Sequence, residues 1–142
     1  MDKRRIEWIL VATDGSERSL EAARYAAELA QRLKVRATLV HVVPIPGPQT
    51  ERSRINPEDE TDVEKALFEG AQVILDRTRE PFDQVAISVE GLIRRGEPDE
   101  AIAKLAREEG YDLIVVAGHE ADGADTSEAI VRASPCPVLV VK

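Results

Sequence analysis

Five short apolar runs, separated by longer stretches with helical periodicity, constrain the fold of this chain more than any other feature. The runs are rich in β-branched residues, as buried strands are, and they cover Trp8–Thr13, Ala37–Val43, Val85–Ile93, Asp112–Ala117 and Pro137–Lys142. Runs that are apolar at nearly every position suit a parallel sheet covered on both faces. Because helical segments lie between successive strands, the pattern predicts an α/β fold: an open, doubly wound, five-stranded parallel sheet with helices on both faces.

Helices are expected in all four intervening segments, and the first and third have clear start or stop signals. Ser16 is a good N-cap for the first helix, in which Leu20 and several alanines form a stripe that would let the helix lie close to the sheet. Pro98 lies in the first turn of the third helix, and Gly110 closes it. The fourth helix is short and covers about residues 126–133.

The region between the second and third strands is less regular. A helix is expected over about residues 62–79, ended by Pro81 because proline cannot continue a helix. Its inward stripe is expected to contain Val63, Leu67, Gly70, Val73, Ile74 and Arg77. Residues 44–60 precede this helix and contain four prolines, so we expect either a flexible surface loop or a loop that contacts a partner.

The size and charge of the chain restrict its organisation and its partners. Residues 1–142 have the length of one domain. The formal net charge is −8 and no basic run exceeds the three residues Lys3–Arg5, so neither a nucleic acid nor an anionic membrane is an expected partner.

Cys136 is the only cysteine, which fits a reducing compartment. No apolar run approaches the roughly 20 residues of a membrane span, so we expect a cytoplasmic protein.

Two loops would form a ligand site if the first and fourth strands were neighbours, since ligands of such sheets bind where the winding direction reverses. Asp14 follows the first strand and would either accept hydrogen bonds from a ribose or an adenine amine, or satisfy local backbone amides. Gly118 follows the fourth strand and either lets a ligand approach the main chain or forms a tight turn. Thr126 and Ser127 can cap the fourth helix.

The second of these loops is acidic. It is followed by a helix, as in many phosphate-binding loops, yet it contains four acids within nine residues and no Lys or Arg: Glu120, Asp122, Asp125 and Glu128. These carboxylates would repel a phosphate. The chain has no glycine-rich phosphate-binding motif, no nucleophile paired with a base, and no carboxylate at metal-ligand spacing from His41 or His119. The sequence therefore predicts a protein that is not an enzyme. The alternatives that remain open are weak phosphotransfer or ATP hydrolysis, and a hydrolase or transferase that uses Asp14.

Four pieces of the chain, in their order and spacing, resemble the universal stress protein family: "ILVATDGSERSLEAARYAAELA", "LVHVV", "RRGEPDEAIAKLAREEGYDLIVVAG" and "SPCPVLVVK". The resemblance runs nearly from end to end. It implies a fold like that of the adenine-nucleotide alpha-hydrolases, with the strand order 3-2-1-4-5, and homodimers joined through the last strand, residues 137–142 here. It also implies that Asp14 and Val42 occupy positions of base and ribose contacts in nucleotide-binding members, and that Gly118 matches the first glycine of their phosphate loop.

The chain departs from the nucleotide-binding pattern after Gly118. Ala121 stands where the second glycine is expected, and the loop is shorter than that of the binders by about seven residues, without their Gly-Ser pair. We therefore expect a dimeric, non-enzymatic stress-response domain with no cofactor, a degenerate nucleotide site and a protein partner that the sequence does not name. The alternative is an ATP- or AMP-binding sensor that uses Asp14, Val42 and Gly118.

Overall fold

The computed structural model describes residues 5–44, 62–118 and 126–142. The elements follow in the order β1 (Trp8–Ala12), α1 (Glu17–Leu33), β2 (Arg36–Val43), α2 (Asp62–Gln84), β3 (Val89–Arg95), α3 (Pro98–Glu109), β4 (Leu113–Ala117), α4 (Thr126–Ala133) and β5 (Val138–Val141). Within the described ranges, no helix is long and apolar enough to cross a membrane. The loop expected over residues 44–60 lies outside these ranges, apart from Pro44.

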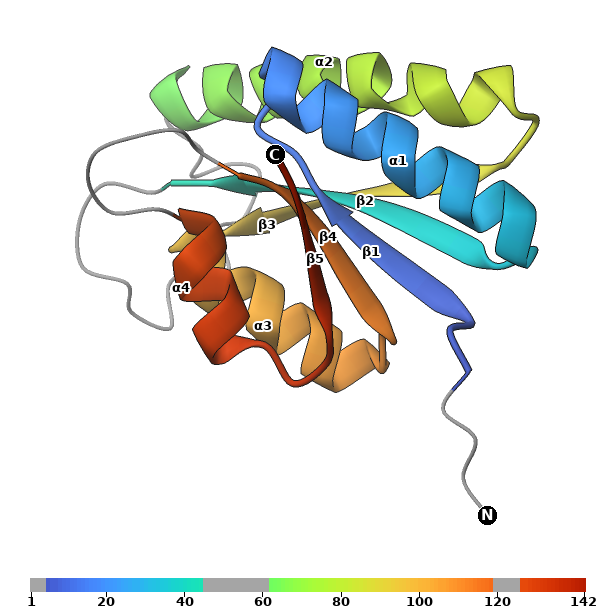
Figure 1. The fold of residues 1–142 in the computed structure, drawn as a ribbon. Helices are drawn as coiled ribbons and strands as arrows, with labels where there is room; N and C mark the ends of the chain where they lie inside the picture. Colours follow the sequence, from blue (N-terminus) through green and yellow to red (C-terminus); the bar gives the residue numbers. More distant parts are fainter. Residues whose placement is uncertain (1–4, 45–61, 119–125) are drawn as a thin grey trace.

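The strands form one five-stranded sheet in the order β3-β2-β1-β4-β5, and all four neighbouring pairs are parallel. This confirms the predicted fold class and strand order. Helices α1 and α2 cover one face of the sheet, and α3 and α4 cover the other (Figure 1). The polypeptide therefore winds in both directions from β1, and the carboxyl ends of β1 and β4 lie side by side.

Small side chains allow α1 to lie close to the sheet, as predicted. Its buried stripe is wider than expected, since it includes five alanines that are at most 2% exposed: Ala22, Ala23, Ala26, Ala27 and Ala30. The side-chain oxygen of Ser16 accepts a hydrogen bond from the amide of Ser19, which confirms the N-cap. Leu33 at the other end of the helix is exposed, so the apolar stripe stops one turn before the helix does.

Helix α2 differs from the prediction in its end and in its buried face. Pro81 lies inside the helix, which ends at Gln84. Because Pro81 and Phe82 are both buried, packing against the core holds this last turn despite the missing amide. The predicted stripe was also wrong, since Val63 and Val73 are exposed and the face that is buried consists of Ala71, Leu75, Thr78, Pro81 and Phe82.

Strand β3 begins at Val89, four residues later than its apolar run. The amides of Val85 and Ile87 both donate to the carbonyl of Phe82, and Ala86 has a left-handed φ of 57°. These residues form the turn that follows α2. Apolar residues in such a turn cannot be separated from a strand by composition, which explains the early start in the prediction.

Candidate ligand-binding site

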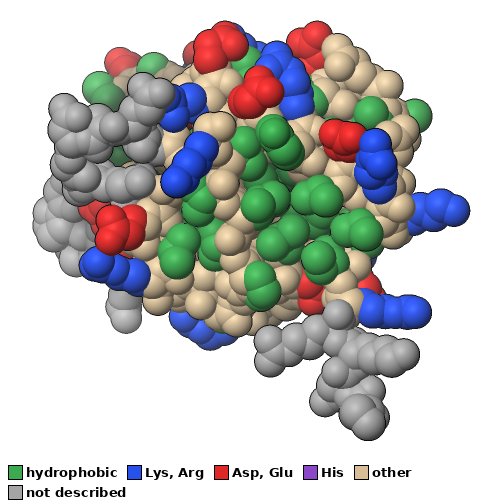
Figure 2. Space-filling model, viewed as in Figure 1, with side chains coloured by type: hydrophobic (Ala, Val, Ile, Leu, Met, Phe, Trp, Pro, Cys, Tyr) green, Lys and Arg blue, Asp and Glu red, His purple; other side chains and the backbone are tan. Residues whose placement is uncertain are grey.

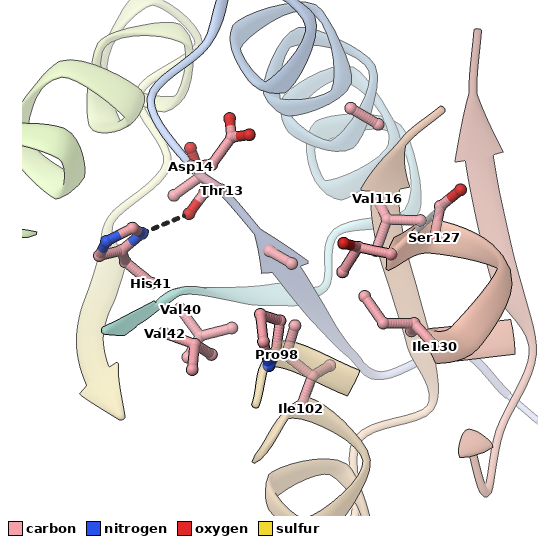
Figure 3. A pocket seen from close by; sticks show the side chains of 13 residues that line it. Thr13, Asp14, Val40, His41, Val42, Pro98, Ile102, Val116, Ser127 and Ile130 are labelled. Atoms are coloured by element: carbon pink, nitrogen blue, oxygen red, sulfur yellow. Dashed lines mark hydrogen bonds between the residues drawn. The ribbon is translucent and has the colours of Figure 1, made fainter. Parts of the chain in front are cut away.

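A cavity of about 210 Å³ opens at the carboxyl ends of the central strands, between α3 and α4 (Figure 3). The residues that line it come from the ends of β1, β2 and β4 and from the first turns of the two helices: Ala12, Thr13, Asp14, Val40, His41, Val42, Pro98, Ile102, Val116, Ala117, Thr126, Ser127 and Ile130. The structure therefore brings Asp14 and Val42 to one cavity. Gly118 is not among the described residues that line it.

Asp14 is held by the turn in which it lies. Its Oδ1 accepts hydrogen bonds from the amide of Ser16 at 2.9 Å and from the hydroxyl of Ser19 at 2.7 Å. Its carboxylate points toward the start of α1 rather than toward Pro98 and Ile102 on the opposite wall (Figure 3). Local capping is thus one role of Asp14, and it fixes the carboxylate at the rim of the cavity.

A buried pair of threonines fixes the turn between β1 and α1. The Oγ1 atoms of Thr13 and Thr78 lie 2.9 Å apart, and that of Thr78 also donates to the carbonyl of Ile74 at 2.7 Å. Because a hydroxyl has one hydrogen, Thr13 must donate to Thr78. Thr13 in turn accepts from the amide of Gly15. Its carbonyl accepts from Nδ1 of His41 at 2.7 Å, which ties the end of β2 to the same turn.

Replacing Thr78 with valine is expected to lower the free energy of unfolding by about 1–3 kcal/mol, because the buried hydroxyl of Thr13 loses its acceptor. Urea denaturation measures the change. Valine at both Thr13 and Thr78 should cost less than the sum of the two single substitutions, since no unpaired donor then remains. If the losses in the free energy of unfolding of the two single variants summed to that of the double variant, the inferred hydrogen bond between Thr13 and Thr78 would be contradicted.

Gly118 has a packing role at the end of β4. It is buried, its amide donates to the carbonyl of Val141 at 2.8 Å, and its carbonyl accepts from Nη1 of Arg18 at 2.9 Å. A Cβ at this position would lie 3.1 Å from Cγ1 of Val140. Close contact with β5 is therefore sufficient to require a glycine here, whether or not a ligand binds nearby.

The walls of the cavity are largely apolar. Val40, Ile102 and Ile130 are buried and belong to the core between the sheet, α3 and α4. Among the described lining residues Asp14 is the one with a formally charged side chain. No three acidic, His or Cys side chains within the described ranges are placed to hold a metal ion. The cavity thus offers a hydrophobic surface with polar groups at its rim.

Sequence reasoning missed the apolar part of this site. Pro98 was assigned to a helix start, and neither Pro98 nor Ile102 was assigned to a cavity. Both belong to the first turns of α3, which begins at the same edge of the sheet as the carboxyl ends of β1 and β2. The right-handed crossover rule places the start of a helix that follows a parallel strand at this edge of the sheet. An inward-facing residue near the start of such a helix is therefore expected to line a cavity there, and this position is the sequence signal that would have identified Pro98 and Ile102.

A family model for the "Universal stress protein family" matches residues 6–142. The chain belongs to this family. The universal stress protein YxiE of Bacillus subtilis is 28% identical to it over 144 residues, which cover 94% of this chain and 97% of YxiE. The structure of the universal stress protein UspA from Lactobacillus plantarum has a TM-score of 0.78 and 25% identity, covering 99% of this chain and 100% of that one.

A universal stress protein in complex with cAMP has the same fold, with a TM-score of 0.76, 23% identity and coverage of 96% of this chain and 97% of that one. At this identity the likeness concerns the fold alone. The matches to YxiE and UspA extend over nearly the full length of both partners, so the family assignment rests on the whole sheet and its helices rather than on a shared loop.

Proposed function

We propose that this universal stress protein is a dimeric, non-enzymatic stress-response domain that acts through protein contacts and has a reduced nucleotide site. The observation that carries the proposal is a difference between the two edges of the sheet. An exposed apolar edge strand promotes uncontrolled pairing unless it is covered. One edge of this sheet is protected by charge, and the other is not.

The protected edge is β3. Glu90 and Arg94 place exposed charges on this strand. Gly91 is covered by the side chain of Arg79, whose Nη2 would lie 2.9 Å from a Cβ at that position. Charged side chains on an edge strand oppose pairing with another chain, because pairing would remove the charges from water.

The unprotected edge is β5, where all four residues from Val138 to Val141 are apolar. Figure 2 shows hydrophobic side chains gathered on the face of the molecule that carries β5, with acidic and basic side chains around them. Leu139 and, from the neighbouring α4, Val131 are exposed large hydrophobic residues. Such a patch with a polar surround is typical of protein interfaces.

The backbone of β5 is also arranged for pairing. The carbonyls of Pro137 and Val141 accept hydrogen bonds from β4. Backbone groups alternate in direction along a strand, so the amides and carbonyls of Val138 and Val140 point away from β4, toward the open edge. A second copy related by a twofold axis would pair antiparallel with these groups. Sedimentation velocity of the full chain at micromolar concentration tests the proposal, and a monomer would contradict it.

The second candidate function is an ATP or AMP sensor. The convergence of Asp14 and Val42 on one cavity favours it, as does the cAMP complex of the related protein. Against it stands the acidic sequence between Gly118 and Glu128, which contains no Lys or Arg. A carboxylate about 8 Å from a phosphate costs roughly 0.5 to 2 kcal/mol per charge pair.

We expect the purified protein to bind ATP with a dissociation constant above about 0.1 mM, with or without magnesium. Calorimetry measures this directly. Binding in the low micromolar range that is lost in Asp14→Ala would support the sensor function instead. The same titration with Glu80→Ala, a change on the outer side of α2 and away from the cavity, is the matched control.

A further inference from the structure

A separate groove lies between α1 and α2, on the face of the sheet opposite to α3 and α4. Its volume is about 230 Å³, and none of its described lining residues belongs to the cavity at the carboxyl ends of the strands. The lining residues are Glu17, Leu20 and Arg24 from α1 and Arg77, Glu80, Pro81 and Gln84 from α2. We propose that this groove binds a free α-amino acid with an aliphatic side chain. The site goes beyond the proposed function and does not depend on it.

The two walls of the groove carry opposite charges at different levels. Helices α1 and α2 run in the same direction, because each connects parallel strands on the same face of the sheet (Figure 1). The salt bridge from Nη2 of Arg77 to Oε1 of Glu17, at 2.7 Å, fixes their register at one end of the groove. Arg24 and Gln84 lie about two turns further along their helices and are therefore at a similar level. Glu80 lies one turn before Gln84, so it is offset from Arg24 by about 5–6 Å along the helix axis.

Arg24 and Glu80 do not neutralise each other across the groove. In the part of the chain that the structure describes, Glu80 forms no salt bridge, and its contact with Nε2 of Gln84 is long, at 3.5 Å. Arg24 pairs with Glu21 through Nη1, and both side chains of this pair are more than half exposed, at 53% and 54%. Such an exposed pair contributes little to stability. Because a guanidinium has five N–H donors, Nε and Nη2 of Arg24 can bind a second carboxylate.

The groove also offers apolar contact between these charges. Leu20 is 7% exposed, and Pro81 is buried. An aliphatic side chain against these two residues would be removed from water. The ammonium group of the same ligand would bind the carboxylate of Glu80, and its carboxylate would bind the guanidinium of Arg24. The two arginines and two glutamates of the lining sum to no net charge, so a zwitterion suits the groove better than an anion or a cation.

The deciding experiment is a titration of the full chain with leucine, followed by proton–nitrogen correlation NMR. We expect saturable shifts of the amide signals of Leu20 and Gln84 with a dissociation constant of about 1–10 mM, since the charges of the groove are exposed. Isocaproate lacks the ammonium group of leucine, isoamylamine lacks its carboxylate, and glycine lacks its side chain. Each of the three should bind at least about fivefold more weakly than leucine. No saturable shifts with leucine, or equally tight binding of any of the three, would overturn the proposal.

Two substitutions locate the ligand. Arg24→Gln and Glu80→Gln each remove one charge at an exposed position and should weaken leucine binding at least about fivefold. Arg132→Gln is the matched control and should leave binding unchanged, because Arg132 also pairs with a glutamate one turn earlier but lies on α4. The dispersion of the NMR signals shows whether each variant is folded. Unchanged leucine binding in folded Arg24→Gln or Glu80→Gln would overturn the assignment of the site to this groove.

Discussion

Replacing Val140 with proline is expected to abolish the dimer and give monomers or aggregates at micromolar concentration. The amide of Val140 points to the open edge of β5, so proline removes a donor from the proposed pairing. The hydrogen bonds between β4 and β5 use the alternate residues Pro137 and Val141 and are retained. The sedimentation coefficient of the variant reports the loss. A Val140→Pro protein that remains a discrete dimer would show that the interface lies elsewhere.

A side-chain substitution tests the same edge without changing the backbone. Leu139→Lys introduces a charge into the apolar surface of β5 and should raise the dissociation constant of the dimer at least about tenfold, because pairing would bury an unpaired ammonium group. Val73→Lys is the matched control, since Val73 is also an exposed apolar residue but lies on α2. Equal effects of the two substitutions would mean that added charge, not position, weakens the dimer.

Replacing Gly15 with alanine is expected to lower the free energy of unfolding by about 1–3 kcal/mol. Gly15 has a left-handed φ of +81°, which is unfavourable for any residue with a Cβ. The added Cβ would also lie 2.9 Å from Cγ1 of Ile74, so the Ile74 side chain, α2 or the turn must shift. Thermal denaturation should show a decrease of roughly 5–10 °C in Tm.

Gly70→Ala is the matched control and should have the opposite sign. Gly70 lies within α2, and an added Cβ there meets nothing within 4 Å. Alanine is favoured over glycine inside a helix by about 1 kcal/mol, so this variant should be slightly more stable than the wild type. If Gly15→Ala and Gly70→Ala were destabilised equally, neither the left-handed φ of Gly15 nor its close approach to Ile74 would explain the loss of stability in Gly15→Ala.

Much of the fold could be predicted from the sequence because apolar periodicity decides it. The run Leu113–Ala117 lies inside the sheet, between β1 and β5, as its uniformly apolar residues indicate, and Ser16 caps α1 as its chemistry requires. The face of α2 could not be predicted in this way. Thr78 is fully buried there because its hydroxyl is satisfied by Ile74 and Thr13, and a pattern of apolar residues omits it.

The candidate site was predictable only in part. The position of Asp14 after the first strand is enough to place it at the carboxyl edge of the sheet. Its bonds to Ser16 and Ser19 depend on the turn geometry that Gly15 permits. The environment of Gly118 depends on Arg18, 100 residues earlier, and on Val140 and Val141. Contacts between segments so distant in the chain require the three-dimensional arrangement.

The end of β5 connects the proposed dimer edge with the end of β4, which borders the cavity. Val140 presents its backbone to the open edge, while its Cγ1 would lie 3.1 Å from a Cβ on Gly118, and the carbonyl of Val141 accepts from the amide of Gly118. A molecule that pairs with β5 therefore also restrains Gly118, which directly follows the cavity residue Ala117. Thermodynamic linkage is reciprocal, so any change in the affinity of the cavity for a ligand on dimerisation must be matched by an equal change in dimer affinity on binding of that ligand.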